Sequence, residues 1–365
     1  MGGQMYDSFD LKILSSKNSY QITMFSEEFQ MRFPKDQVSI IDSSLIGHQA
    51  HIFEENEKVI LLQGDESSKQ FSEVGKILAV LADYGLKRGE KVTVIGGGSI
   101  QDISTITTSL YMRGINWDYY PTTLAAMMDS CIGGKSSINL GPRKNLIGNF
   151  HPPQNIIINP SYVSTLPKMQ ISCGIAEGVK ICFAKGSSEL NSFMNDIYAW
   201  RTNRHVSHLV SSIRTSLEAK KYFIEIDEFD TGERQLLNYG HSFGHALESS
   251  SEYSIPHGIG VLVGMVAANL YVDNFVNHGE FTSFLMNEFN ESGFSEKKVT
   301  INRTSLIRAL SQDKKNSRDY QVLILPNKNG GLQRVEIPLS EKNLEKSADV
   351  AIEALFRIGA EIEVL

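Results

Sequence analysis

Five short apolar runs within residues 21–160 constrain the fold of this 365-residue chain more than any other feature. They lie at residues 21–25, 38–42, 58–64, 91–98 and 155–159. Their length and composition predict buried β-strands. Between them, Phe71, Val74 and Leu78 recur three to four residues apart, which predicts a helix with one apolar face. Strands that alternate with helices are typical of a parallel sheet with helices on both faces.

From about residue 170 the pattern changes to long helical periodicities. We expect helices at residues 171–185, 205–225, 236–251, 258–277 and 343–358, with one strand at 321–326. A chain of this length exceeds what one core usually covers, so two domains are expected. The predicted fold is α/β, with an N-terminal Rossmann-like parallel-sheet domain at residues 1–168 and an α-helical domain at residues 169–365.

Composition narrows the class of partner. The net charge of -7 argues against nucleic acid as the main partner. The three cysteines, Cys131, Cys173 and Cys182, form no CxxC pair, which favours a reducing compartment. The sequence contains no secretory signal pattern and no apolar run long enough for an ordinary membrane helix. We therefore expect a cytoplasmic protein that binds a small molecule rather than nucleic acid or a membrane.

Residues 96–102 read Gly-Gly-Gly-Ser-Ile-Gln-Asp and directly follow the predicted strand at 91–95. A glycine-rich turn between a strand and a helix lets backbone N–H groups approach a phosphate, and the helix N-terminus favours its negative charge. The turn differs from the dinucleotide fingerprint GxGxxG. The alternative is a tight turn that binds nothing.

A second polar cluster follows within a short stretch of chain. It comprises Pro-Thr-Thr-Leu at 121–124, Asp-Ser-Cys-Ile-Gly-Gly-Lys at 129–135, and Lys144 with Asn145. Lysines attract phosphate as point charges, and glycine permits close backbone approach. The alternative is a solvated loop with ordinary surface lysines.

The C-terminal half carries the strongest metal signal. His241 and His245 lie four residues apart, the helical spacing of a metal-binding pair, and His257 follows closely. Arg234 and Asn238 precede the pair at helical intervals, so all four side chains would share one face of the predicted helix. An exposed polar face is the alternative, although the intervening residues are apolar.

Glu177 and Lys180 lie three residues apart on the first predicted helix of this half. This spacing puts both side chains on one helix face. Taken alone, the pair is better explained as an ion pair within the helix than as part of a site.

Together and in this order, the motifs resemble those of the 3-dehydroquinate synthase family of sugar-phosphate cyclases. The resemblance covers roughly residues 38–325 and also includes Tyr-Met-Arg-Gly at 111–114, Thr-Leu-Pro at 165–167 and Asp-Lys-Lys at 313–315. It implies an NAD-binding domain at residues 1–168, a metal- and substrate-binding domain at residues 169–365, an active site in the cleft and a homodimer.

The implied reaction converts a seven-carbon keto-acid phosphate, 3-deoxy-D-arabino-heptulosonate 7-phosphate, to 3-dehydroquinate with loss of phosphate. This phosphorus–oxygen lyase reaction belongs to the shikimate pathway of aromatic amino acid biosynthesis. NAD oxidises one hydroxyl, helped by zinc or cobalt, and the new carbonyl acidifies the neighbouring C–H so that phosphate leaves. The hydride then returns, and an aldol step closes the ring.

The resemblance also assigns residues. The metal would be held by Glu177, His241 and His257, which moves His245 from the metal to the substrate. Positions that match NAD contacts are Asp42, Glu66, Lys69, Gly97, Gly98, Asp102, Thr122, Thr123, Lys144 and Thr165. Positions that match catalytic or substrate contacts are Arg113 (supplied across the dimer), Asp129, Lys135, Asn145, Lys180, Lys220, Arg234, Asn238, His245 and either Lys314 or Lys315.

The chain departs from the family pattern at several positions. Ser99 and Gln101 replace small or aliphatic residues, and Ile259 stands where Glu commonly follows His-Gly. These departures keep open a paralogous cyclase of secondary metabolism, of the amino-dehydroquinate, inosose or valiolone type. Lys220 and Arg234, which suit a carboxylate, favour the keto-acid substrate. Two further alternatives are a metal-dependent polyol dehydrogenase, which would release NADH, and a non-catalytic nucleotide-binding protein.

Overall fold

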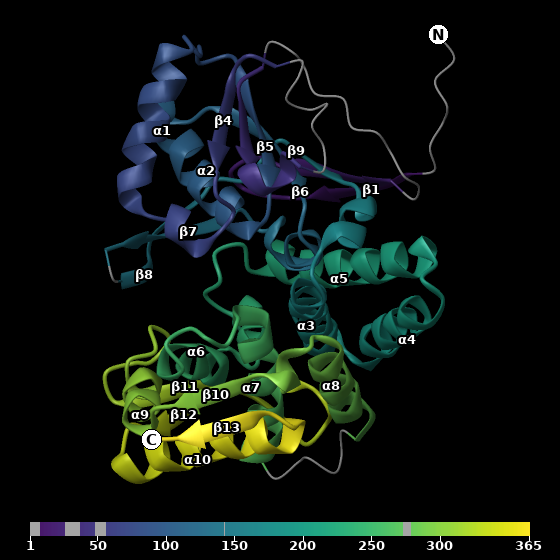
Figure 1. The fold of residues 1–365 in the computed structure, drawn as a ribbon, viewed down its shortest axis with the longest axis vertical. Coiled ribbons are helices and arrows are strands. Elements are labelled where there is room, and N and C mark those ends of the chain that lie inside the picture. Colours follow the sequence, from purple (N-terminus) through teal and green to yellow (C-terminus); the bar gives the residue numbers. More distant parts are fainter. Residues whose placement is uncertain (1–7, 26–36, 48–55, 142, 273–278) are drawn as a thin grey trace. The chain divides into compact units, whose positions relative to one another are not determined.

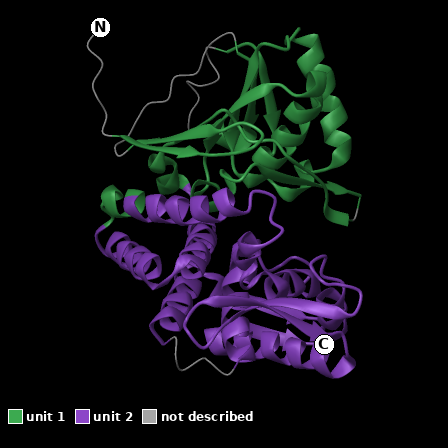
Figure 2. Ribbon diagram, turned by 180° about the vertical axis from the view of Figure 1, so that it is seen from behind, with its two compact units in different colours: residues 1–165, 204–210 green, residues 166–203, 211–365 purple. Residues whose placement is uncertain are grey.

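The computed structural model describes residues 8–25, 37–47, 56–141, 143–272 and 279–365. By contacts between Cα atoms the chain divides into two compact units (Figure 2). The first unit comprises Met1–Thr165 with Arg204–Val210, and the second comprises Leu166–Asn203 with Ser211–Leu365.

A seven-stranded sheet forms the first unit, in the strand order β1-β2-β9-β6-β5-β3-β4. Its strands are β1 (Ser8–Ile13), β2 (Tyr20–Phe25), β3 (Ser39–Asp42), β4 (Val59–Leu62), β5 (Lys91–Gly96), β6 (Asn116–Pro121) and β9 (Asn155–Ile158). All pairs are parallel except β1 with β2. Every residue of β3 is buried, which explains why Ile40 and Ile41 stand next to each other instead of alternating with polar residues. The parallel-sheet prediction is confirmed.

Two helices connect consecutive parallel strands of this sheet. Helix α1 (Phe71–Asp83) joins β4 to β5, α2 (Gly98–Leu110) joins β5 to β6, and the two helices pack against each other (Figure 1). A hairpin that the sequence did not predict, β7 (Lys135–Leu140) with β8 (Arg143–Phe150), packs on α2. The glycine turn therefore opens directly into α2, with the hairpin beside it.

The second unit is mainly helical, as predicted. Its helices are α3 (Lys168–Lys185), α4 (Ser187–Asn203), α6 (His241–Ser250), α7 (His257–Tyr271), α8 (Gly279–Glu291), α9 (Arg303–Ser311) and α10 (Glu341–Ile358), together with α5 (Val206–Ile226) from Ser211 onward. Small two-stranded sheets join β11 (Tyr320–Pro326) to β12 (Leu332–Pro338), and β10 (Lys298–Ile301) to β13 (Glu361–Val364). The part of the predicted 258–277 helix at 273–278 lies outside the described residues.

Glycines bring α3, α6 and α7 unusually close. A Cβ on Gly264 of α7 would come within 2.0 Å of the carbonyl oxygen of Gly240, and one on Gly258 within 2.5 Å of the Cα of Cys173. Only glycine permits such backbone approach. Helix α7 is buried along almost its whole length, so it forms the centre against which α3 and α6 pack.

The predicted helix at 236–251 is wrong at its start. Residues Glu233–Asn238 form a separate 3-10 helix, and α6 begins only at His241. Gly240 between them has φ 79°, a left-handed conformation that ends one helix before the next begins. Consequently Arg234 and Asn238 do not share a face of α6 with the two histidines. Within the described residues, no helix is long and apolar enough to cross a membrane.

Candidate functional site

Three histidines meet in the second unit. His241 and His245 occupy the first two turns of α6, and His257 begins α7. Their ring centroids lie 5.3 Å (241–245), 5.3 Å (241–257) and 5.4 Å (245–257) apart. One ring nitrogen from each lies within 4.8 Å of the others, which is the geometry of a possible metal site. Close packing of α6 on α7 produces this arrangement.

Helix α3 adds a carboxylate to the cluster. Glu177 Oε1 lies 3.2 Å from His257 Nε2, and Glu177 Oε2 lies 2.5 Å from Lys180 Nζ. Glu177 and Lys180 are both buried. The ion pair within the helix therefore exists, and the same carboxylate also faces the histidines.

Two of the three imidazoles are oriented by hydrogen bonds from Nδ1. His257 donates to Glu248 Oε1 at 2.9 Å, and His241 donates to the carbonyl oxygen of Tyr239 at 3.3 Å. These bonds use Nδ1 of both rings, so Nε2 is the nitrogen of each that remains for a ligand, as is usual for metal-binding histidines. Among the described residues, the ring of His245 makes no such hydrogen bond.

Burial and neighbouring charges set the protonation of the cluster. Burial, together with the cations of Lys180 and Lys315, lowers the pKa of His241 well below its usual value. Burial and repulsion from the neighbouring histidines and lysines lower the pKa of His245. Both rings are therefore neutral at neutral pH, the form that binds a metal.

The pKa values of His257 and Glu177 move in opposite directions. Desolvation opposes both charges, but the neighbouring carboxylates of Glu177 and Glu248 raise the pKa of His257 to about 10. Burial likewise opposes ionisation of Glu177, but Lys180 and His257 lower its pKa. Glu177 is thus held as a carboxylate next to the histidines.

The positive charges of the Asp-Lys-Lys segment after α9 also act on this cluster. Both lysines help to lower the pKa of His245, and Lys315 has the larger effect. Lys315 Nζ lies 3.0 Å from Asp313 Oδ2, and burial lowers the pKa of this ammonium.

The predicted carboxylate-binding residues lie outside α6. Arg234 is buried on the 3-10 helix, and its Nη1 donates to the carbonyl oxygen of Glu228 at 2.5 Å. Asn238 Nδ2 donates a hydrogen bond to the carbonyl oxygen of Gln235 at 3.0 Å. Lys220 is buried on α5.

In the first unit, the glycine turn is closed by the Pro-Thr-Thr segment. Thr122 N donates to the carbonyl oxygen of Gly96 at 3.1 Å. A Cβ on Gly97 would lie 2.8 Å from Cγ2 of Thr123, so glycine is required for this contact. The turn and the segment after β6 therefore form one surface at the start of α2.

A polar network joins four of the predicted residues. Lys69 Nζ lies 2.8 Å from Asp102 Oδ2, 3.1 Å from Asn145 Oδ1 and 3.7 Å from Glu66 Oε2. Burial opposes the charge of Lys69, but Asp102 and Glu66 raise its pKa, so it remains an ammonium. Burial raises the pKa of Asp102 in spite of Lys69.

The sequence interpretation missed two members of this network. Asn139 donates to Glu66 Oε1 at 2.9 Å, and the backbone N–H of Ser137 donates to Asp102 Oδ1 at 3.1 Å. They lie two residues apart on β7, the period of one strand face. Had the hairpin at 135–150 been predicted, this two-residue spacing would have indicated that Ser137 and Asn139 lie on the same face of a strand.

The remaining predicted residues are more dispersed. Asp42 ends β3 and its carboxylate accepts a hydrogen bond from Ser44 N, and Thr165 Oγ1 donates to the carbonyl oxygen of Tyr162. Asp129 lies in a single π-helical turn, Ala126–Ser130, and Lys135 begins β7. The exposed predicted residues of this unit include Lys144 on β8 and Arg113, whose φ is 67°.

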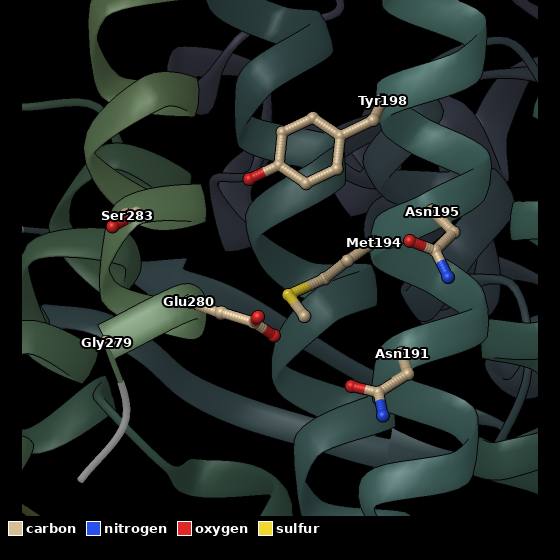
Figure 3. Close-up of a pocket in the computed structure, with 7 residues that line it drawn as sticks. All are labelled: Asn191, Met194, Asn195, Tyr198, Gly279, Glu280 and Ser283. Atoms are coloured by element: carbon tan, nitrogen blue, oxygen red, sulfur yellow. The ribbon is translucent and has the colours of Figure 1, made fainter.

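A groove elsewhere in the second unit involves none of these residues. It lies between α4 and α8 and is lined by Asn191, Met194, Asn195, Tyr198, Gly279, Glu280 and Ser283. Figure 3 shows Met194 and Glu280 pointing into the space between the two helices. No histidine and no cation lines it, so we do not associate it with the metal cluster.

Comparison with known proteins defines the class. The fold resembles that of 2-deoxy-scyllo-inosose synthase, solved with carbaglucose-6-phosphate, NAD+ and Co2+ (TM-score 0.78, 22% identity, 94% of this chain and 100% of that one). It also resembles 2-epi-5-epi-valiolone synthase from Streptomyces hygroscopicus subsp. jinggangensis, solved with NAD+ and Zn2+ (TM-score 0.77, 19% identity, 93% and 98%). The chain therefore has the fold of the sugar-phosphate cyclases.

Sequence comparison identifies the family. Residues 59–173 match the 3-dehydroquinate synthase N-terminal domain, and residues 174–316 match the C-terminal domain. The 3-dehydroquinate synthase of Dictyoglomus thermophilum is 36% identical over 294 residues, which cover 80% of this chain and 82% of that one. The chain belongs to the 3-dehydroquinate synthase family.

Proposed function

We propose that the chain converts 3-deoxy-D-arabino-heptulosonate 7-phosphate to 3-dehydroquinate, a phosphorus–oxygen lyase reaction that needs NAD and a divalent metal. Membership of the family supports the reaction. One structural observation carries the metal requirement. Buried Glu177 Oε1 has no partner with hydrogen-bond geometry among the described residues, yet it lies 3.2 Å from His257 Nε2. A buried carboxylate oxygen in this state is costly unless a ligand satisfies it.

The donor set fits zinc or cobalt. Glu177, His241 and His257 offer one carboxylate oxygen and two imidazole nitrogens, which suits a catalytic metal that keeps a position open for substrate. The hydrogen bonds from Nδ1 of both histidines favour them over His245 as ligands. His245, whose ring is neutral and otherwise uncommitted, is then available to accept a hydrogen bond or a proton from the substrate.

The first unit fits a dinucleotide. The glycine turn opens into α2, whose N-terminal N–H groups can bind a phosphate. Asp42 at the carboxyl end of β3 is suited to a ribose hydroxyl, since ligands of such sheets bind at the ends of parallel strands. When bound, NAD would supply a reversible hydride acceptor and the metal a Lewis acid for the substrate hydroxyl.

Charged side chains of the second unit suit an anionic substrate. Lys180 holds Glu177 as a carboxylate. Of the two lysines left open by the sequence, we propose Lys315 as the substrate contact, because its buried Nζ lies 3.0 Å from Asp313 Oδ2 but has no partner with hydrogen-bond geometry among the described residues. Arg234 and Lys220 are buried cations that suit the substrate carboxylate.

Phosphate release tests the proposal directly. The full chain should release inorganic phosphate from the seven-carbon keto-acid phosphate only when NAD and a divalent metal are present, and a chelator should abolish release. NADH should not accumulate, because the hydride returns to the substrate. Stoichiometric NADH without phosphate release would instead identify a polyol dehydrogenase.

A paralogous cyclase of secondary metabolism is the second candidate. The observation that favours it is the pair of departures from the family pattern at Gln101 and Ile259, both of which are buried in the structure. A substrate panel that includes phosphorylated sugars without a carboxylate separates the two cyclases. Turnover of such a sugar in preference to the keto acid would support the paralogue.

We also propose a homodimer to which Arg113 contributes. The side chain is exposed, and both Arg113 and Met112 have positive φ, a strained conformation for residues other than glycine. The turn at Tyr111–Arg113 therefore holds the guanidinium of Arg113 on the surface, where a second subunit could bind it. Light scattering on the purified chain tests the assembly, and a monomer that is fully active would contradict it.

A further inference from the structure

We propose that Gln101 is a positioning residue for the dinucleotide, because its side-chain amide fixes the segment after Asp129 to the first turn of α2. The inference rests on the proposed function and deepens it. It gives a role to a position at which this chain departs from the family pattern, where a small or aliphatic residue could not make the same contacts.

Both ends of the Gln101 amide bind the same residue. Nε2 donates to the carbonyl oxygen of Ser130 at 2.6 Å, and Oε1 accepts from Ser130 Oγ at 2.7 Å. Gln101 is only 3% exposed, so water does not compete for either bond. A paired contact of this kind fixes the orientation of both side chains and is worth more than one bond on the surface.

Ser130 lies between the π-helical turn and the glycine-containing segment that leads to Lys135. It closes the π-helical turn Ala126–Ser130, directly after the candidate carboxylate Asp129. It is followed by Gly133 and Gly134, which both have positive φ, and then by Lys135. The position of Ser130 therefore controls the segment from Asp129 to Lys135.

The other side of the contact is the start of α2. A Cβ on Gly98 would lie 3.6 Å from Ser130 Oγ, so the serine lies against the first residue of the helix. The next residue after Gln101, Asp102, accepts a hydrogen bond from Ser137 N at 3.1 Å. Two successive residues of α2 thus bind the 129–137 segment.

This arrangement prepares the phosphate-binding surface before the ligand arrives. The N–H groups at the start of α2 and the segment that carries Asp129 and Lys135 can act on one ligand only if their relative position is fixed. Fixing it in advance lowers the cost of ordering on binding. The Ser130 hydroxyl proton is committed to Gln101, so the serine acts through position and not as a donor to the ligand.

The test is NAD binding to the full-length protein by isothermal titration calorimetry, with unfolding temperatures measured in parallel. Gln101→Met keeps the approximate volume but removes both bonds. It should raise the Kd for NAD by about 5- to 30-fold, from the loss of two buried hydrogen bonds and of pre-organisation. Ser130→Ala removes one of the bonds and should have a smaller effect. The double variant should be no worse than Gln101→Met alone, because both changes break the same contact.

Thr108→Val is the matched control. Thr108 is buried on the same helix and donates to the carbonyl oxygen of Ser104 at 2.7 Å, away from the glycine turn. It should lower stability while NAD affinity is retained. Equal loss of affinity in Thr108→Val and Gln101→Met would reduce Gln101 to a structural residue and overturn the inference.

The remaining outcomes separate this inference from the proposed function. If the wild-type protein binds NAD and Gln101→Met binds it equally well, the positioning role is wrong and the proposed function stands. If the wild-type protein does not bind NAD, both are wrong. If Gln101→Met does not fold, unchanged affinity in Ser130→Ala would overturn the inference.

Discussion

Glu248 Oε1 accepts a hydrogen bond of 2.9 Å from Nδ1 of His257, while Nε2 of the same ring faces Glu177 at 3.2 Å. The imidazole is therefore held between two carboxylates, with one nitrogen used for orientation and the other turned to the candidate metal position. A Cβ on Gly260 would come within 3.3 Å of Glu248 Oε1, so the carboxylate packs closely against the backbone of α7 and has little room to move.

Glu248→Gln should weaken metal binding by about 10- to 100-fold, the usual effect of losing the partner that orients a metal-binding histidine. Competition for zinc against a chelating dye measures it without reference to turnover. Glu252→Gln is the control, since Glu252 is an exposed acid two residues past the end of the same helix. Equal affinities of the two variants would show that Glu248 does not orient the metal site.

Substitution of single histidines separates the two possible ligand sets. His257→Ala should lose the metal, because Glu177 and His241 alone bind poorly, whereas His245→Ala should keep the metal and lose turnover. Metal content of the purified variants, measured by mass spectrometry, distinguishes them. If His245→Ala lost the metal as completely as His257→Ala, His245 would be a metal ligand and its assignment to the substrate would be wrong.

Periodicity in the sequence predicted the elements whose burial follows a simple rule. The apolar runs became parallel strands, and α3, α5 and α10 fall close to their predicted ranges. Strand β6 was missed because it carries Asn116, Asp118 and Pro121, although Trp117 and Tyr119 are fully buried. Its burial depends on the neighbouring strands and not on its own composition.

Periodicity also predicted only part of the candidate metal site. The spacing of His241 and His245 predicted two neighbouring rings on one helix, and the rings are neighbours. The face shared with Arg234 was wrong, because Gly240 approaches the carbonyl oxygen of Val261 closely and breaks the helix. Periodicity cannot reveal such a break, since the residues on both sides still repeat at helical intervals. Glu248 lies three residues after His245, and this spacing could have indicated it.

Asp227 provides a pH-dependent contribution to stability near Arg234. Its carboxylate accepts hydrogen bonds from the backbone N–H groups of Thr231 (2.9 Å), Gly232 (2.7 Å) and Arg234 (3.1 Å). Partial burial opposes its charge, but these bonds lower its pKa. Because the pKa is lower in the folded state than in the unfolded state, the contribution is complete above the unfolded value and is lost as pH falls through the folded one.

Asp227→Asn should therefore lower the unfolding temperature at pH 7, and the difference from the wild-type protein should shrink as pH falls to about 3. Thermal unfolding across this range measures it. Asp83→Asn, at the exposed end of α1, serves as the control and should show no such trend. A deficit that stayed constant with pH would show that the charge of Asp227 is not involved.

Arg234 is expected to bind the substrate carboxylate, although not from the helix face that the sequence suggested. The 3-10 helix Glu233–Asn238 carries it, and Asp227 holds its backbone in place. Nη1 is used by the carbonyl oxygen of Glu228. This bond fixes the plane of the guanidinium, and a fixed plane suits bidentate recognition of a carboxylate.

Arg234→Ala should lower kcat/KM for the keto-acid phosphate by about 30-fold or more, since a lost charge-assisted contact typically costs about 2–5 kcal/mol when its partner is left buried. Arg234→Lys should recover only part of the loss, because lysine keeps the charge but not the planar fork. Steady-state kinetics on a decarboxy analogue supplies the internal control, since an analogue without the carboxylate should be turned over equally by wild-type and variant proteins. Equal losses on both substrates would show that Arg234 supports the loop, and a wild-type preference for the analogue would favour the secondary-metabolism cyclase.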